Sequence, residues 1–420
     1  MLMRNVILGV ITAAVLCVLI TTGASTTLRA GADVSDFSTI YNTSRWALEH
    51  RTLDDPRALR FYPPSARPIL MLFALVPRPA AAVFWWAISA ALHFLCLFLI
   101  VKYMLPGKAA DPLLLGAVSY LALIPWAVSD LSAGNLSPVV LAGIVVSYFF
   151  YRRERPIAAG IALGVGVAVK LAPVFLLFFY VVKRRGKAAL MSGLCTVLIG
   201  TIPGVLLVGP RDFLKSWKTW HTTAVKMCSA EYAITGERAP YREQSLAYVM
   251  VRLLNPISAG RHDKPFYVNV ANLSRPTILT LWYALVIITF LAWIFLIRPR
   301  RFDPPSIEYV HLALVTLAVV WFSPHVLSYY LIIPMPAVVL LIYALGEKEG
   351  VFAPLRIPLA IILGLYIVGC FSPASHYLRA LGSYQFVVLV LAVAMILIAR
   401  ELRRAPRQPA LTDGPPGTQP

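Results

Sequence analysis

RRERPIAAGIALGVGVAVKLAPVFLLFFYVVKRRGK, residues 152–187, places about 26 mostly apolar positions between two basic clusters. Short loops rich in Lys and Arg lie on the cytoplasmic side of membrane proteins. A single crossing would put the two clusters on opposite sides. Two short helices, bent near Lys170 and Pro173, would put both in the cytoplasm. We therefore predict a helical hairpin, with one long tilted helix as the alternative.

The composition of the whole chain agrees with a membrane protein. Of 420 residues, 59% are hydrophobic and 14% are charged, whereas soluble domains have roughly 45–50% apolar and about 25% charged residues. Intrinsic disorder is excluded too, because it requires low hydrophobicity. The net charge of +19 gathers in clusters at the ends of apolar runs, which is an orientation signal and predicts no nucleic-acid partner.

Hydropathy predicts an all-α, polytopic integral membrane protein with about twelve membrane segments, since a spanning helix needs about 20 apolar residues. The segments lie near Val6–Ala24, Ala80–Met104, Pro112–Val128, Pro138–Tyr151, Ile157–Val169, Leu171–Val182, Ala188–Val208, Thr277–Ile297, Ile307–Phe322, Val326–Leu345, Ile357–Phe371 and Tyr384–Ala399. Both termini are then cytoplasmic, and residues 1–404 form one transmembrane domain. Two long outer loops, about 25–79 and 209–276, remain. Residues 405–420 are rich in Pro and Gly and predict a disordered cytoplasmic tail. The first segment is either a retained helix or a signal peptide.

The first outer loop carries two carboxylates, Asp33 and Asp36, just beyond the first predicted helix. A carboxylate at this position can take a proton from a hydroxyl nucleophile. The alternative is that both residues merely cap a helix near Phe37.

Further candidate residues occur in the apolar runs and the second loop. Lys170 lies in the middle of an apolar run, and ionisable residues within membranes are usually functional; a snorkelling lysine is the alternative. Gln244 is followed eight positions later by Arg252, whose planar guanidinium suits a phosphate. A solvated amphipathic helix would explain the same pattern.

Three more candidates fall at predicted outer helix ends: Asn135, His325 and Tyr329. A lone histidine beside a proline turn, such as His325, is more often structural. The nucleotide-binding and zinc-protease motifs are absent, and no Cys or His spacing suits zinc. The residues alone therefore predict an outward-facing, lipid-embedded site for a lipid-carried anionic substrate, without ATP or a metal.

Several short pieces, in order, resemble the polyprenyl-phosphate-sugar-dependent glycosyltransferases of family 87. They span roughly residues 30–335. The pieces are Asp36-Phe37 with Tyr41, Tyr62-Pro63-Pro64, Phe84-Trp85-Trp86 after Pro77, Gly134-Asn135-Leu136, Arg155-Pro156-Ile157-Ala158-Ala159-Gly160 followed ten residues later by Lys170 and then by Pro173, Gln244-Ser245-Leu246 with Arg252, and Ser323-Pro324 with Tyr329-Tyr330.

The resemblance implies a GT-C fold in a bacterial plasma membrane, with an active site facing the periplasm or exterior. It implies inverting transfer of a sugar, best guessed as mannose, from a polyprenyl phosphate to a hydroxyl of a glycolipid or glycan. Asp36 would be the general base, with Asp33 as the fallback, and no metal or other cofactor is expected. Lys170 and Arg252 would bind the donor phosphate. The other implied substrate-binding residues are Tyr41, Tyr62, Asn135, Gln244, His325 and Tyr329.

The chain departs from the family pattern at three places. Gly134 stands where the family often has Gln, and Glu243 where it often has Asn. The family's outer histidine usually falls near Ser328 or Tyr329, whereas His325 follows Pro324 at once. Either His325 replaces that histidine from a shifted position, or its role is lost.

Two other function classes fit part of the sequence. A transporter or lipid-linked sugar flippase would also place Lys170 in the membrane, but internal repeats are expected there. A non-catalytic scaffold would not bring the charged candidates together. Convergence of Asp36, Lys170 and Arg252 on one outer cavity would favour the enzyme, and a wide separation would argue against it.

Overall fold

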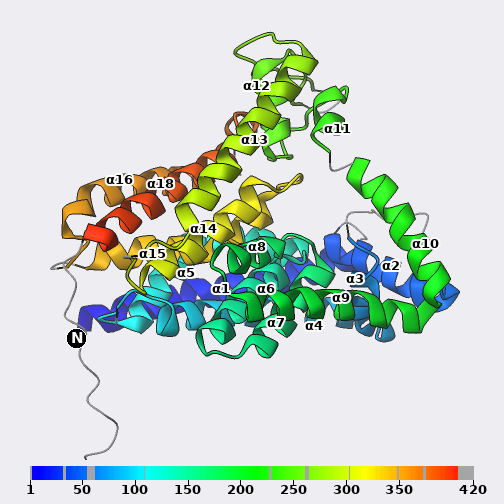
Figure 1. Cartoon of the computed structure of the whole chain (residues 1–420), viewed down its shortest axis with the longest axis horizontal. Helices are drawn as coiled ribbons and strands as arrows, with labels where there is room; N and C mark the ends of the chain where they lie inside the picture. The colour runs from blue at the N-terminus through cyan, green and yellow to red at the C-terminus, as the bar shows by residue number, and fades with distance from the viewer. Residues whose placement is uncertain are drawn as a thin grey trace, which may run out of the picture.

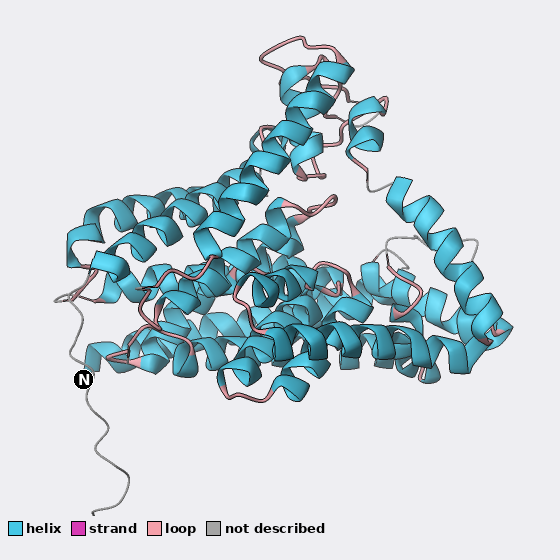
Figure 2. Ribbon diagram, in the orientation of Figure 1, coloured by secondary structure: helices cyan, strands magenta, loops and turns pink. Residues whose placement is uncertain are grey.

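The computed structural model describes residues 2–31, 35–53, 62–107, 109–226, 229–260, 264–301, 303–347, 350–371 and 375–404. Within these ranges every regular element is a helix (Figure 2). The predicted all-α fold class is therefore confirmed. The predicted tail, residues 405–420, and Asp33 lie outside the described residues.

All twelve predicted membrane segments coincide with helical elements. These are α1 (Leu2–Gly31), α4 (Arg78–Tyr103), α5 (Pro112–Ala133), α6 (Ser137–Arg152), α7 (Pro156–Val169), α8 (Val174–Val182), α9 (Gly186–Val208), α13 (Arg275–Ile297), α14 (Ile307–Trp321), η3 (Ser328–Ile332) with α15 (Met335–Gly346), α16 (Arg356–Cys370) and α18 (Ser383–Arg404). Among the described residues, seven helical stretches are long and apolar enough to cross a membrane. The others, including α7 and α8, are shorter.

The predicted hairpin of α7 and α8 is confirmed by the packing of α7 against α9. A Cβ at Gly160 would lie 2.7 Å from the backbone of Met191, and one at Gly164 would lie 2.8 Å from the backbone of Cys195. Both glycines are needed because the two backbones approach so closely. Since contacts advance by four residues along both helices, α7 and α9 run in the same direction. The chain must therefore reverse through α8.

The two basic clusters that flank this hairpin meet at one carboxylate. Arg152, at the end of α6, donates to Glu308 at 2.9 Å, and Arg185, just after α8, lies 3.6 Å from the same side chain. Both clusters therefore lie at the same end of the helix bundle, as predicted. Asn135 and Lys170 lie at the opposite ends of α6 and α7.

The two long loops fold into further helices at that opposite end. They contain α2 (Asp36–His50), α3 (Ala66–Leu70), η1 (Met71–Leu75), α10 (Pro210–Trp220), η2 (His221–Val225), α11 (Ala230–Thr235) and α12 (Leu246–Leu254). α10 leads away from the end of α9, and the chain returns through α11 and α12 to α13 (Figure 1). The short elements η4 (Ala353–Leu355) and α17 (His376–Ala380) precede α16 and α18.

The core and the surface reflect a lipid environment. The largest apolar cluster joins α5, α14, α15 and α18, with Trp126 and Met395 completely buried. Large apolar side chains also stand exposed on α9 and α13, such as Leu206 and Ile288. An outward apolar surface on long helices is the expected lipid-facing side of a membrane protein.

Candidate active site

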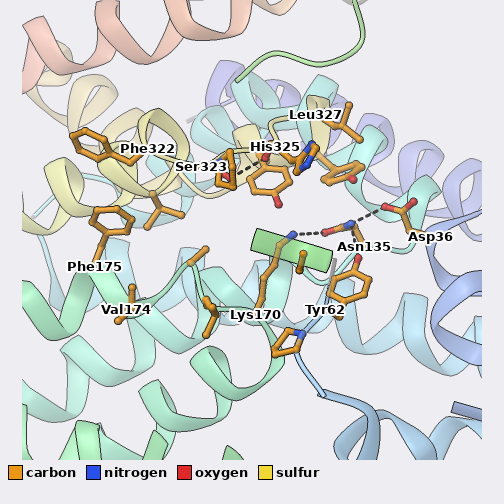
Figure 3. Close-up of a pocket in the computed structure, with 18 of the residues that line it drawn as sticks. Asp36, Tyr62, Asn135, Lys170, Val174, Phe175, Phe322, Ser323, His325 and Leu327 are labelled. Carbon is orange, nitrogen blue, oxygen red and sulfur yellow. Dashed lines mark hydrogen bonds between the residues drawn. The ribbon is translucent and has the colours of Figure 1, made fainter. Parts of the chain in front are cut away.

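One cavity of about 490 Å³ lies among α2, the α5–α6 turn, the α7–α8 bend and the segment before η3. Its lining includes six of the predicted site residues: Asp36, Tyr62, Asn135, Lys170, His325 and Tyr329. Figure 3 shows Asp36, Asn135 and Lys170 along one wall, with Val174, Phe175 and Phe322 toward the other end. The cavity is therefore polar at one end and apolar at the other.

The start of α2 places Asp36 at the cavity. Ser35, rather than Asp36, caps the helix, because its hydroxyl accepts the backbone N–H of Ser38 at 3.0 Å. Asp36 occupies the first helical turn, where a carboxylate also interacts favourably with the helix dipole. Its side chain is half-buried and lines the cavity. The capping alternative for Asp36 is thus wrong.

The turn between α5 and α6 brings Asn135 to Asp36. Gly134 ends α5 with a φ of 65°, and a Cβ there would lie 2.7 Å from the Cβ of Phe37. The indole N–H of Trp85 donates to the Gly134 carbonyl at 3.0 Å. Only glycine tolerates both this backbone conformation and this contact.

Asn135 connects the Asp36 carboxylate and the Lys170 ammonium of the site. Its Nδ2 donates to Asp36 Oδ2 at 2.6 Å and to the Tyr62 hydroxyl at 3.1 Å. Its Oδ1 accepts from Lys170 Nζ at 3.3 Å and from the Ser137 backbone N–H at 3.1 Å. Asn135 is 1% exposed, so these partners fix the orientation of its amide. Asp36 and Lys170 are thereby held on either side of one side chain.

The α7–α8 bend holds Lys170 in place. Lys170 follows the last residue of α7 in an extended conformation, and its ammonium lies 4.1 Å from the Tyr330 ring centroid and 5.8 Å from that of Tyr62. Cation–π contacts of this kind stabilise an ammonium away from bulk water. The ammonium faces the cavity, so the snorkelling alternative is wrong.

Tyr62 and Tyr329 complete the polar end. Burial, reinforced by the charge of Asp36, raises the pKa of Tyr62 well above its usual value. Tyr62 therefore keeps its proton and can donate it to an acceptor in the cavity. The Tyr329 side chain also interacts with the Asp36 carboxylate.

A model of glycosyltransferase family 87 matches residues 61–324, a range that holds Tyr62, Asn135 and Lys170. The chain belongs to glycosyltransferase family 87. It is also similar to a polyprenol-phosphate-mannose-dependent α-(1-2)-phosphatidylinositol mannoside mannosyltransferase of Mycobacterium tuberculosis. The identity is 26% over 384 residues, covering 84% of this chain and 79% of the relative. No solved structure matches the chain. Family membership favours an enzyme over the transporter and scaffold alternatives.

Two predicted substrate-binding residues of the glycosyltransferase do not line the cavity. The Tyr41 hydroxyl donates to the Val76 carbonyl at 2.9 Å. Gln244 is completely buried, and its Nε2 donates to the carbonyls of Tyr241 and Arg379. Each of these side chains donates to main-chain carbonyls, so both stabilise loop backbones and neither faces the cavity.

Arg252, which was predicted to bind the donor phosphate, does not line the cavity either. It is completely buried in α12, and its guanidinium donates to the carbonyls of Pro240 at 2.9 Å, Glu243 at 2.6 Å and Ala380 at 3.0 Å. Burial lowers the pKa of Arg252 to about 9, which leaves it charged at neutral pH. Because carbonyls occupy its donors, Arg252 supports the loop that carries Glu243 and does not face a phosphate.

Sequence reasoning also missed residues of the site. Glu243 and Trp220 line the cavity. Outside the cavity lining, His93 and Asp130 form a completely buried pair at 3.0 Å, and the Asp130 carbonyl accepts the backbone N–H of Gly134. The sequence signal for this pair is that both residues are ionisable and lie in or beside predicted membrane segments. An ionisable side chain in a membrane is costly unless it is paired.

Replacing Asn135 with Asp should place a second carboxylate beside Asp36. Like charges at this distance cannot both ionise easily. We expect the transfer rate at neutral pH to fall at least ~100-fold, the lower range for removing a general base, and activity to begin at a higher pH. A pH profile of the transfer rate measures both effects. Asn272→Asp, at an exposed position, is the control, and an unchanged profile for Asn135→Asp would contradict the role given to Asn135.

Arg252→Met should loosen the loop around Glu243, because it leaves several buried carbonyls without donors. Each such loss costs roughly 1–3 kcal/mol. The backbone N–H of Gln244 donates to the Val326 carbonyl at 2.8 Å. We expect the hydrogen exchange of this N–H to become at least ~10-fold faster. Mass spectrometry of exchanged peptides measures it. Arg242→Met, at an exposed neighbour, should change little, and equal exchange in both variants would argue against the support role.

Proposed function

We propose that this glycosyltransferase transfers mannose from a polyprenyl phosphate mannose to a hydroxyl of a glycolipid or glycan acceptor, with inversion at the anomeric carbon. The observation that carries the proposal is that Asp36 and Lys170 line one cavity and bind the same amide of Asn135. A proton acceptor and a cation are thus positioned together, as a displacement with an anionic leaving group requires. The donor named by the Mycobacterium tuberculosis relative supports the choice of sugar and carrier.

The two ends of the cavity suit a lipid-carried donor. Val174, Phe175 and Phe322 provide an apolar surface for the polyprenyl chain, while Lys170 at the polar end meets its phosphate. Phe175 and Phe322 stack with ring centroids 5.6 Å apart. A small number of placed polar groups in an otherwise apolar pocket is typical of ligand sites. The donor is thereby oriented with its sugar toward Asp36.

The reaction then proceeds as a single displacement. Asp36 takes the proton of the acceptor hydroxyl, and the hydroxyl oxygen forms a bond to the anomeric carbon. The bond from that carbon to the phosphate oxygen breaks, and polyprenyl phosphate leaves with the electron pair. Lys170 stabilises the negative charge that develops on the leaving oxygen. Asn135 orients the Asp36 carboxylate by donating to it.

The site faces the outer side of a bacterial plasma membrane in this proposal. The basic clusters meet at Glu308, at the end of the bundle opposite Asn135 and Lys170. The positive-inside rule assigns the clusters to the cytoplasm. The cavity then opens toward the periplasm or exterior, where membrane lipids supply both donor and acceptor.

The defining experiment incubates purified protein in detergent with polyprenyl phosphates carrying mannose, glucose, galactose or arabinose and a membrane lipid extract. Mass spectrometry should detect a glycolipid one hexose heavier with the mannosyl donor, and its anomeric configuration should be opposite to that of the donor. A product with retained configuration would overturn the mechanism, and a product only from another donor would overturn the choice of sugar.

Metal removal should leave the transfer rate unchanged, because the leaving group is a single phosphate next to Lys170. Within the described residues, no group of three or more His, Cys, Asp or Glu side chains could hold a metal ion. The measurement compares initial rates with EDTA, with EDTA plus excess Mg²⁺ or Mn²⁺, and untreated. A rate lost with EDTA and restored by either ion would contradict this expectation.

A further inference from the structure

A second polar cluster lines the cavity, apart from the Asp36 network. His325 Nδ1 lies 3.2 Å from Glu243 Oε2, and both side chains line the cavity. The Ser323 hydroxyl donates to the His325 carbonyl at 2.8 Å. The two partners come from separate parts of the chain, the loop before α12 and the segment between α14 and η3. Folding therefore assembles a carboxylate and an imidazole at one point of the cavity wall.

The backbones that carry this pair are joined by buried contacts. The Gln244 N–H donates to the Val326 carbonyl at 2.8 Å, which links the residues next to Glu243 and His325 directly. Arg252 donates to the Glu243 carbonyl, and Gln385 Nε2 donates to the Gln244 carbonyl at 2.8 Å. A completely buried guanidinium is costly unless its donors are occupied. The buried Arg252 guanidinium therefore indicates that the backbone of Glu243 is held in a fixed position.

The chemistry of the pair excludes one class of ligand and favours another. A carboxylate repels phosphate, so Glu243 is unsuited to the donor's phosphate, which Lys170 serves. An ionised carboxylate has two acceptor oxygens and binds hydroxyl donors strongly, while an imidazole can donate or accept. Side by side, they match neighbouring hydroxyls on a sugar ring. Trp220, also in the cavity lining, provides an apolar face for the ring's C–H groups.

We propose that Glu243 and His325 form the acceptor subsite, binding neighbouring hydroxyls of a neutral sugar and rejecting acceptors that carry a phosphate on that ring. This inference rests on the proposed transferase function, whose acceptor it specifies. The pair contacts the non-reacting hydroxyls of the acceptor, while Asp36 serves the reacting one. Because the two sites share one cavity, fixing the acceptor ring at Glu243 also orients its nucleophilic hydroxyl.

The test uses octyl α-mannoside as acceptor, its monodeoxy analogues and its 6-phosphate, with polyprenyl phosphate mannose as donor. Glu243→Gln and His325→Gln should raise the acceptor KM about 10- to 100-fold, the range expected for hydrogen bonds to a charged group. The donor KM should stay within about twofold. Glu237→Gln, at an exposed residue of the same loop, is the matched control and should behave as wild type.

The analogues identify the contact itself. In wild type, one or two deoxy analogues should be poor acceptors, and in Glu243→Gln the penalty for the same missing hydroxyls should shrink, because the partner is already lost. The 6-phosphate should be rejected by wild type and accepted better by Glu243→Gln. A rise in donor KM instead, or deoxy penalties unchanged by the substitution, would overturn the acceptor subsite. Absence of transfer by wild type to the membrane lipid extract with every donor of the panel described above would overturn the proposed function instead.

Discussion

Asp36→Asn should reduce the transfer rate by about 10²- to 10⁴-fold, the usual contribution of a general base. Asparagine has nearly the same shape as aspartate but cannot take the acceptor's proton. Its amide would also face the Nδ2 donor of Asn135, now 2.6 Å from the Asp36 carboxylate. The measurement is the initial rate of mannosyl transfer by purified protein at saturating donor and acceptor.

Folding should survive this substitution, which makes the result interpretable. Ser35 caps α2 through its own hydroxyl, so the helix start does not depend on the Asp36 charge. Thermal unfolding in detergent and donor binding serve as controls. Asp33→Asn, in the same assay, tests the neighbouring acid. Near-normal turnover by Asp36→Asn, or loss confined to Asp33→Asn, would remove Asp36 from the role of base.

Lys170→Gln should reduce kcat about 10²- to 10³-fold, as for loss of one preorganised donor to a developing negative charge. Glutamine can still reach Asn135 but carries no charge for the phosphate. Since that charge grows as the leaving group departs, kcat should fall more than donor affinity. The separate kcat and donor KM values, from initial rates over a range of donor concentrations, provide the test.

A lysine at the other end of the bundle provides the control for Lys170→Gln. Lys187 is exposed at the start of α9, within the cluster assigned to the cytoplasm. Lys187→Gln should leave both kinetic parameters unchanged. If Lys170→Gln changed the donor KM alone, Lys170 would be a binding residue without a part in the transition state. If it changed neither value, the phosphate would bind elsewhere.

The membrane fold was predictable because its signals are local. Apolar length and basic helix ends mark membrane helices wherever the tertiary contacts lie, and the repetition of basic clusters around Lys170 required the hairpin of α7 and α8. For the same reason Asp36, Asn135 and Lys170 were found in advance. Topology placed all three on the outer side of the bundle, and the resemblance to family 87 assigned them to one site.

The roles of Arg252, Gln244 and Glu243 depended on the tertiary structure. In a polar loop, a guanidinium or amide can serve a ligand or the chain's own carbonyls, and the sequence pattern is the same for both. Folding decided between them by burying Arg252 and Gln244 against backbone carbonyls and leaving Glu243 beside His325 in the cavity. Hydropathy located the membrane helices because lipid acts on each segment separately. Hydrogen-bond partners in the loops had to be found across the fold, because burial determines which donors and acceptors remain available to a substrate.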